Sequence, residues 1–245
     1  MTMARQEVVE RVVSWDELAE MGVPQEVLAV RDEIEFLPSP FRTDLLLVYV
    51  QLRGVTPLLQ HRPALRAVKK QRGGQYDPHK EAERAAYRHP THGWLYVKSD
   101  VIRALLRDYG LSFIKRKVAD ALLRCVDGVR PLEIPIIDPY TGDYVRTYEI
   151  QEYSGVLNPR VGRVVQWRPL IRHWQLDFIL LLNTYYLETS DLLSLLYDGF
   201  QKGGRTIGIG DWRPLIVKSG KVTHTGGEFG KFLLTAFCPI KWEEG

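Results

Sequence analysis

The chain has 245 residues, of which 45% are hydrophobic and 26% are charged, and its formal net charge is +3. This size and apolar content suit one large domain or two small ones with a real core, and they exclude a wholly disordered protein. No apolar run reaches the length of a membrane span, and residues 1–12 lack the apolar core of a secretory signal. Two cysteines, Cys125 and Cys238, are too few for a disulfide framework, so we expect a soluble cytoplasmic protein.

Charge is unevenly divided along the chain. Residues 1–41 hold nine acidic and three basic side chains and carry −6, whereas residues 42–245 hold 30 basic and 21 acidic ones and carry +9. Residues 46–76 contain six bases and no acid. Such a block favours a polyanionic partner, although a solvated face would have the same composition. We therefore expect an acidic helical appendage, residues 1–43, attached to a basic body, residues 44–245, that binds nucleic acid.

The first elements are an N-terminal helix and a buried strand. Ser14 and Glu17 have the spacing of a capping box, which predicts a helix directly after the serine. Pro38 and Pro40 mark a boundary. The near-continuous apolar run at residues 45–52 then predicts a central strand that is buried on both faces.

The middle of the chain combines a long basic insertion with two expected helices. Residues 58–93 are basic and only weakly periodic, which is typical of a functional or mobile insertion. A short strand at 94–97 leads into a helix over about 99–108, and a second helix covers about 115–124. This second helix starts with three cations, which oppose the helix dipole, so we expect a compensating anion there.

The second half of the chain is predicted to be mostly strand. Residues 132–150 carry β-rich arms around the turn-forming residues 138–143, which predicts a hairpin. The elements expected after it are strands at 161–168 and 174–185, a helix over about 190–202 that ends at Gly203 and Gly204, and a last strand at 231–238.

A glycine-rich segment lies between the last helix and the last strand. Its glycines are interleaved with Arg205, Trp212, Arg213 and Lys231. Glycine permits close backbone approach to a ligand, and arginine and tryptophan beside bare N–H groups suit phosphate contact and base stacking. The segment lacks a Walker motif and does not follow a strand as a dinucleotide fingerprint does. We expect it to contact nucleic acid, with a core position as the alternative for Trp212.

The predicted order is βαββαβ, that of a ferredoxin-like or RNA-recognition-type antiparallel sheet of the α+β class. Three segments also resemble the repeat-associated mysterious proteins (RAMPs) of CRISPR systems. LYVKSDVIRALLR resembles their strand, serine and helix element, although Lys98, Asp100 and Ala104 depart from it. GIGDWRP and GGEFGKF resemble their C-terminal glycine-rich loop, and the first strand runs into GVTP as theirs runs into a small-residue loop.

This resemblance implies a modified RNA-recognition fold with insertions at about 54–98 and 109–160. The hairpin at 132–150 resembles the thumb of the backbone subunits of CRISPR effectors, which polymerise along a guide RNA. RNA is then the favoured ligand, with DNA as the alternative, and the implied partners are further copies of the chain or other effector subunits. Similar segments occur in phage and archaeal-virus proteins, so a nucleoprotein that packages DNA inside a virion is a second interpretation.

The nucleic-acid contacts are expected from cations and from the glycine-rich segment, with little sequence selectivity because phosphate contacts carry no base information. The expected contact residues are Arg62, Arg66, Lys69, Lys70, Arg72, Arg103, Arg107, Lys115, Arg116, Lys117, Arg205, Gly208, Gly210, Trp212, Arg213 and Lys231.

We expect a binding protein rather than an enzyme, with no cofactor and no metal. His79, His89 and His92 share one insertion, but a zinc site needs three or four organised ligands. Two residues are candidates for an endoribonuclease. The resemblance gives Asp77 the place of an aspartate with which some backbone subunits cut RNA, and His61 could act as a general base if a partner lay within hydrogen-bond reach. A protein–protein scaffold is the remaining alternative.

Overall fold

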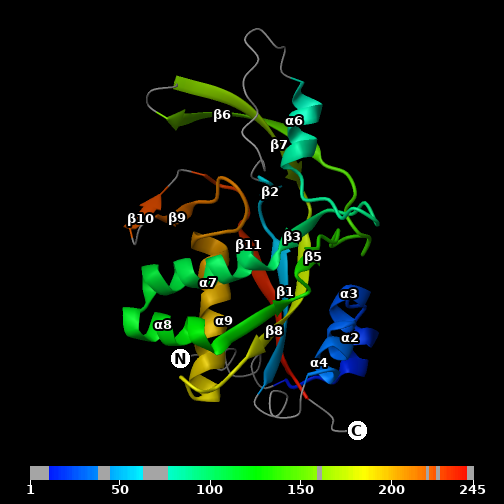
Figure 1. Ribbon diagram of the computed structural model, residues 1–245, viewed down its shortest axis with the longest axis vertical. Coiled ribbons are helices and arrows are strands. Elements are labelled where there is room, and N and C mark those ends of the chain that lie inside the picture. Colours follow the sequence, from blue (N-terminus) through cyan, green and yellow to red (C-terminus); the bar gives the residue numbers. More distant parts are fainter. Residues whose placement is uncertain are drawn as a thin grey trace.

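A four-stranded antiparallel sheet forms the centre of the protein, shown in Figure 1 as a computed structural model. Its strands lie in the order β11-β1-β8-β4 and comprise β1 (Leu46–Gly54), β4 (Val126–Arg130), β8 (Gln175–Leu182) and β11 (Phe232–Ile240). The structure describes residues 11–37, 45–62, 77–158, 162–218, 221–224 and 227–241. The protein is of the α+β class with antiparallel sheets, as the sequence predicts.

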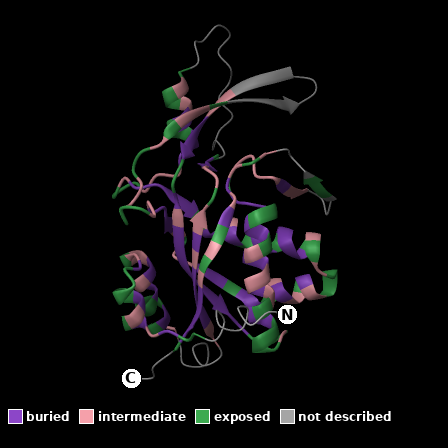
Figure 2. Cartoon of the chain, turned by 180° about the vertical axis from the view of Figure 1, so that it is seen from behind, coloured by how far each residue is buried: buried purple, intermediate pink, exposed green. Residues whose placement is uncertain are grey.

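Three helices cover one face of this sheet, namely α7 (Ser99–Phe113), α8 (Arg116–Cys125) and α9 (Thr189–Thr206). Side chains alternate between the faces of a strand, so Val48, Val50 and Leu52 of β1 all point to the same side. They join the main core, which the three helices close. Figure 2 shows the central sheet buried between the layers on its two faces, with exposed residues on the outer sides of the helices.

The opposite face of the sheet is covered by the acidic N-terminal helices, α2 (Trp15–Glu20), α3 (Gln25–Leu28) and α4 (Val30–Glu35). Leu47 and Tyr49, which alternate with the residues above, form a second core with them. The predicted capping box is confirmed, because the Glu17 amide donates to Ser14 Oγ at 3.1 Å and the Ser14 amide to Glu17 Oε2 at 2.8 Å. Described residues 11–37 therefore pack on the body rather than standing away from it.

A second sheet extends beyond one end of the central sheet (Figure 1). It has the order β2-β7-β6, with β2 (Leu58–Leu59), β6 (Glu149–Asn158) and β7 (Gly162–Ile171), and α6 (Pro78–Ala85) packs on β7. Two short pairs complete the described strands, β3 (Tyr96–Lys98) with β5 (Glu133–Pro135), and β9 (Leu215–Lys218) with β10 (Lys221–His224). None of the helices among the described residues is both long and apolar enough to cross a membrane.

One strand assignment made from the sequence is wrong. Residues 161–168 were expected in the central sheet, but residues 162–168 belong to β7, which pairs with β6 and β2. β4 takes that place beside β8. Its sequence, VDGVR, is short and contains an aspartate and a glycine, so nothing in it marks a central strand. The packing partner decides its conformation.

The hairpin expected at 132–150 is present only around its turn. The Asp138 amide donates to the Asp143 carbonyl and the Val145 amide to that of Ile136, both at 2.8 Å. Its first arm pairs with β3, and the end of its second arm begins β6. The hairpin that stands out from the protein is instead β6–β7 (Figure 1).

Gly203 and Gly204 do not end the last helix, because α9 continues to Thr206. They lie where the helix meets its neighbours. A Cβ on Gly204 would come within 2.4 Å of the Phe232 carbonyl oxygen, so this glycine permits close packing of α9 on β11.

Candidate nucleic-acid interface

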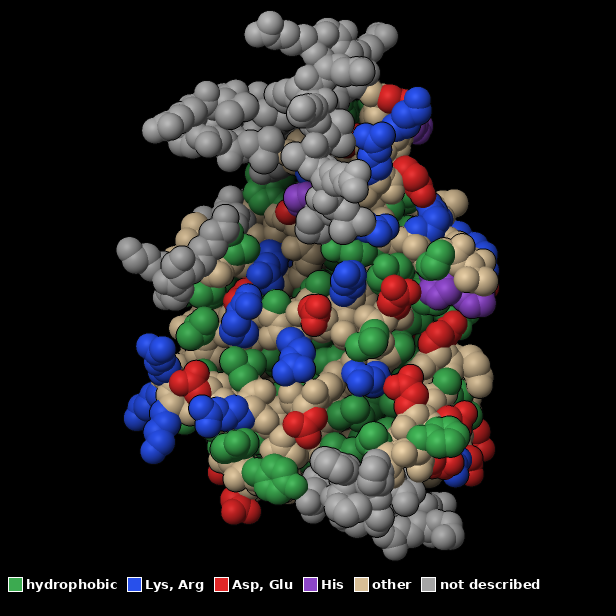
Figure 3. All heavy atoms as spheres, in the orientation of Figure 1, with side chains coloured by type: hydrophobic (Ala, Val, Ile, Leu, Met, Phe, Trp, Pro, Cys, Tyr) green, Lys and Arg blue, Asp and Glu red, His purple; other side chains and the backbone are tan. Residues whose placement is uncertain are grey.

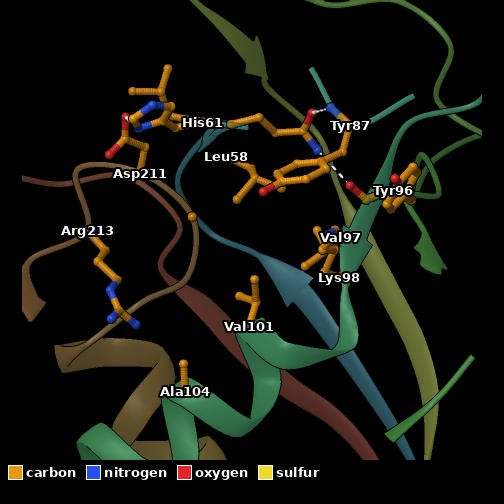
Figure 4. A pocket seen from close by; sticks show the side chains of 13 residues that line it. Leu58, His61, Tyr87, Tyr96, Val97, Lys98, Val101, Ala104, Asp211 and Arg213 are labelled. Carbon is orange, nitrogen blue, oxygen red and sulfur yellow. Dashed lines mark hydrogen bonds and ion pairs between the residues drawn. The ribbon is translucent and has the colours of Figure 1, made fainter. Parts of the chain in front are cut away.

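A pocket of about 230 Å³ lies where β2, β3 and α7 meet the glycine-rich segment (Figure 4). Its apolar lining comes from Leu58, Leu59, Val97, Val101 and Ala104. Its polar and aromatic lining comes from Gln60, His61, Tyr87, Tyr96, Lys98, Asp211 and Arg213. Strand ends, a helix start and a loop thus bring residues from four parts of the sequence together.

Backbone hydrogen bonds connect the two parts of the glycine-rich segment to each other and to the loop after β1. The Ile209 amide donates to the Gly230 carbonyl at 3.0 Å, and the Gly230 amide donates to the Pro57 carbonyl at 2.8 Å. Gly230 has a φ of +69°, and a Cβ there would lie only 1.8 Å from the Ile209 oxygen. The close approach that requires glycine at this position is therefore between two segments of this protein.

Gly208 and Gly210 also lie where the glycine-rich segment packs closely against other parts of the chain. Gly208 is buried, whereas Gly210 is exposed and has a φ of +82°. A Cβ on Gly210 would meet the Leu59 oxygen at 2.6 Å, and the next amide, of Asp211, donates to that same oxygen at 2.8 Å. The two glycines thus fix Asp211 and Arg213 at the wall of the pocket.

A buried ion pair ties this segment to α7. Asp108 has a fully buried side chain, and its Oδ2 lies 2.6 Å from Nη2 of Arg213, whose side chain is 14% exposed. Its Oδ1 lies 3.1 Å from Nη2 of the half-exposed Arg107. The charge of Arg213 is thus already compensated inside the protein. Two cations that the sequence assigned to nucleic acid therefore share one buried carboxylate.

A second charged group stands at the rim of the pocket. Nδ1 of His61 lies 3.4 Å from Oδ2 of Asp211, and Nε of the buried Arg168 lies 3.5 Å from the same oxygen. Burial would raise the pKa of Asp211, but the hydrogen bond and charge of His61, the Trp212 amide and the Arg168 charge together outweigh it. The pKa of Asp211 therefore lies below its ordinary value. His61 thus has the hydrogen-bond partner that a general base requires.

Exposed cations continue from this pocket over the helices. Figure 3 shows Lys and Arg side chains spread over the face that carries α7 and α8 and acidic ones gathered over α2–α4. The predicted contact residues that are exposed here are Arg62, Arg103, Arg107, Lys115, Arg116, Lys117 and Arg205. Arg103 donates to the Asp127 carbonyl at 3.3 Å. Lys115 is the N-cap of α8 without a side-chain cap, so the three cations do stand at a helix start.

The remaining predicted residues fall into two groups. Arg66, Lys69, Lys70 and Arg72 lie outside the described residues. Lys231 and Trp212 are half-buried, and the Lys231 carbonyl accepts from the Val55 and Thr56 amides.

Asp77 caps the start of a helix. It is the N-cap of α6, and its Oδ1 accepts from the amides of His79 and Lys80 at 3.0 and 3.3 Å. The amide of Lys80 is the largest cause that lowers its pKa. The rings of His89 and His92 are in contact, with their centroids 4.6 Å apart and their planes tilted by 34°. Within the described residues, no group of three or more His, Cys, Asp or Glu side chains is arranged to hold a metal ion.

The sequence did not single out Tyr87, Asp108 or Asp211. Asp108 and Arg213 are 105 positions apart, and no spacing rule connects them. Asp211 lies within the glycine-rich motif but is an acid in a basic segment. Only the fold shows that its charge is matched by His61 and Arg168.

No protein-family model matches this sequence, and no curated protein matches it. The structure is similar to a chain in the cryo-EM structure of the Type III-B Cmr-beta bound to cognate target RNA, with a TM-score of 0.51 and 14% identity. The similarity covers 86% of this chain and 66% of that chain, so this chain spans just under two thirds of its neighbour's length. The protein therefore has a fold like that of a CRISPR effector subunit.

Proposed function

We propose that this protein is a RAMP-like, non-enzymatic subunit that binds single-stranded RNA through its phosphates and oligomerises along it. The observation that carries the proposal is the row of exposed cations on α7 and α8, on a fold similar to a chain from an RNA-bound complex. Phosphate contacts give affinity without sequence selectivity.

The order of the central sheet supports the finer fold proposal. β1, α7, β4, β8, α9 and β11 follow one another in the chain, and the strands lie in the order β11-β1-β8-β4. This order supports our proposal of a ferredoxin-like or RNA-recognition-type sheet with insertions. The acidic helices α2–α4 cover one face of the sheet. We therefore propose that RNA binds on the opposite side, over α7, α8 and the pocket.

The start of α8 is the part of the surface that we propose most specifically as a phosphate site. Lys115, Arg116 and Lys117 are exposed, and none of them makes an ion pair with a described residue. A helix N-terminus favours a negative charge, and three adjacent cations repel one another without one. A phosphate group would satisfy the free amides and the cations together.

Charge also supports head-to-tail assembly. The exposed acidic side chains Asp16, Glu20 and Asp32 of α2 and α4 lie on the opposite face of the sheet from the cations of α7 and α8. Complementary faces on one chain allow one copy to contact the next. We propose that the acidic unit, residues 1–43, makes this contact with the basic unit, residues 44–245. In this proposal the assembly forms in the cytoplasm, or in a virion if a virus encodes the protein.

The test is a salt titration of RNA binding by fluorescence anisotropy. The variant in which Lys115, Arg116 and Lys117 are all changed to Gln should bind every RNA sequence less tightly. Its plot of log affinity against log salt should be flatter by about 2, because each lost single-strand phosphate contact removes about 0.7. Arg172→Gln removes an exposed cation that lies outside α4, α7 and α8, so it is the control and should change neither quantity. An unchanged slope in the triple variant would contradict the phosphate site.

Two further measurements separate the alternatives. Sedimentation with RNAs of increasing length should show complexes that grow with the RNA. Tighter binding to duplex DNA than to RNA would instead favour a nucleoprotein that packages DNA.

The pair of His61 and Asp211 favours an endoribonuclease as a second candidate function. The carboxylate would orient the ring through Nδ1 and leave Nε2 to accept the proton of a ribose 2′-hydroxyl. RNA cleavage in the presence of EDTA that is lost in His61→Ala and retained in Asp77→Ala would support this candidate. Absence of cleavage by the wild-type protein would exclude it.

A further inference from the structure

We infer that the pocket between Tyr87 and α7 takes one unstacked nucleobase of the bound strand. This inference rests on the proposed function and names the ligand of the same surface. The phosphate contacts proposed for α7 and α8 involve exposed side chains and do not use the pocket. The pocket would therefore bind a different chemical group of the same ligand. A nucleobase is the apolar, planar part of a nucleic acid.

The size of the pocket suits such a group. Its volume of about 230 Å³ lies below the range of about 300–1,000 Å³ that is usual for drug-sized ligands. Val101 and Ala104 of α7 lie on one side of it, and the ring of Tyr87 reaches in from the opposite side (Figure 4). A flat ring system can therefore enter between an aromatic face and aliphatic side chains.

The aromatic side of the pocket is held in place by a buried amide. Gln60 is buried, with 4% of the residue exposed. Its Oε1 accepts from the Tyr87 amide at 3.0 Å, and its Nε2 donates to the Tyr96 carbonyl at 2.8 Å. The rings of Tyr87 and Tyr96 lie 5.6 Å apart. This support fixes the backbone that carries Tyr87 before a ligand arrives, which lowers the entropy lost on binding.

Besides Asp211, which is paired with His61 and Arg168, the rim of the pocket carries cations. Nζ of Lys98 lies 5.7 Å from the ring centre of Tyr87, and Lys98 makes no ion pair within the described part of the chain. Arg62 is exposed, and its amide donates to the carbonyl of Ala85, two residues before Tyr87, at 2.9 Å. An apolar interior with cations at the opening has the polarity of a nucleotide, with the base inside and the phosphate outside.

α7 connects the pocket to the phosphate surface. Val101 and Ala104 line the pocket, and Arg103 and Arg107 on the same helix are exposed. A free nucleotide has the same chemistry as one nucleotide of a strand. We commit to the strand because the exposed arginines continue beyond the pocket, where a mononucleotide has no further phosphates.

The experiment compares two strands that differ only in their bases, a 12-nucleotide oligouridine and an abasic strand of equal length. The wild-type protein should prefer oligouridine. Stacking of one base on an aromatic side chain corresponds to about 5- to 150-fold in affinity, and we expect about tenfold. Tyr87→Ala, which removes the ring, and Ala104→Trp, which fills the pocket, should both reduce this preference about tenfold. Neither should change the salt slope, because no phosphate contact is lost.

Two variants control for damage to the fold. Tyr87→Phe keeps the ring and should keep the wild-type preference. Leu111→Trp places the same large side chain on α7 at an exposed position that does not line the pocket, and it should behave as the wild type. Thermal unfolding followed by circular dichroism establishes that all four variants fold.

The outcomes separate the inference from the proposed function. If the wild-type protein binds neither strand, the proposed function fails, and the inference fails with it. If it binds both strands equally, or if Tyr87→Ala and Ala104→Trp keep the preference, the pocket inference is overturned while phosphate binding stands. If adenosine monophosphate fills the pocket and the strand preference does not respond to the variants, the pocket serves a free nucleotide, and the inference is likewise overturned.

Discussion

Removal of the Asp108 carboxylate is expected to destabilise the protein strongly. Its side chain is fully buried, and it is the counter-charge of Arg213, which is 14% exposed. In Asp108→Ala the guanidinium of Arg213 stays in the interior without this partner. Breaking a buried ion pair in this way costs about 3–5 kcal/mol, and the partial exposure of Arg213 places the loss near about 3 kcal/mol. For a chain of this size the melting temperature should then fall by about 6–12 °C.

Urea unfolding followed by circular dichroism measures this loss. The matched control is Arg107→Ala, which removes the other partner of Asp108. The Arg107 side chain is 51% exposed, so its loss should cost at most about 1 kcal/mol. Arg213→Ala and the double variant complete a cycle, in which we expect a coupling of about 1–3 kcal/mol. If Asp108→Ala stays within about 1 kcal/mol of the wild type and the coupling is near zero, the pair does not hold the glycine-rich segment.

Three further predictions concern the stability of the protein: the effect of a left-handed glycine, the effect of a helix cap, and the dependence on pH. Gly230→Ala should cost well over the about 1–2 kcal/mol of a left-handed alanine, because its Cβ would meet the Ile209 oxygen at 1.8 Å. Gly142→Ala, at a φ of +77° with nothing within 4 Å, should cost only the backbone strain; equal melting temperatures would refute the difference. Ser14→Ala should lower the unfolding free energy by about 1 kcal/mol in urea, unless the capping box is dispensable. The lowered pKa of Asp211 means that its contribution is present above the ordinary aspartate pKa of 3.8 and is lost as the pH falls through the folded-state value. Asp211→Asn should therefore lose less stability than the wild type between pH 5 and about 3, and parallel curves would contradict this.

The sequence predicted the elements whose pattern is local. The apolar run at residues 45–52 became β1, and the serine and glutamate of the capping box start α2 as expected. The sequence could not predict β4, because VDGVR becomes a strand only through its pairing with β8, which includes a register shift between Val126 and Gly128. A strand of this kind depends on a partner that lies far along the chain.

The candidate site was predicted by composition more than by arrangement. Exposed cations on α7 and α8 agree with the charge pattern, whereas Arg213 is held by a buried carboxylate that no spacing rule marks. The pocket could not be predicted at all. Tyr87 comes from the end of the basic insertion and Gln60 from its start, whereas the α7 residues that also line the pocket come from another part of the sequence. Only the tertiary fold brings these groups together.

The position of β1 has a consequence for synthesis of the chain on the ribosome. β1 lies between β8 and β11, so its two partners are residues 175–182 and 232–240. While they are untranslated, both edges of an apolar strand are unpaired. Such an edge is a template for aggregation, and pairing across so long a separation is slow.

The N-terminal helices cannot shield this strand early either, because their core includes Cys238 and Ile240 of β11. Both faces of the central sheet thus close only when β11 has been made. We expect nascent chains to need chaperone protection until then, and chains that stop before residue 232 to be recovered as aggregates rather than as folded fragments.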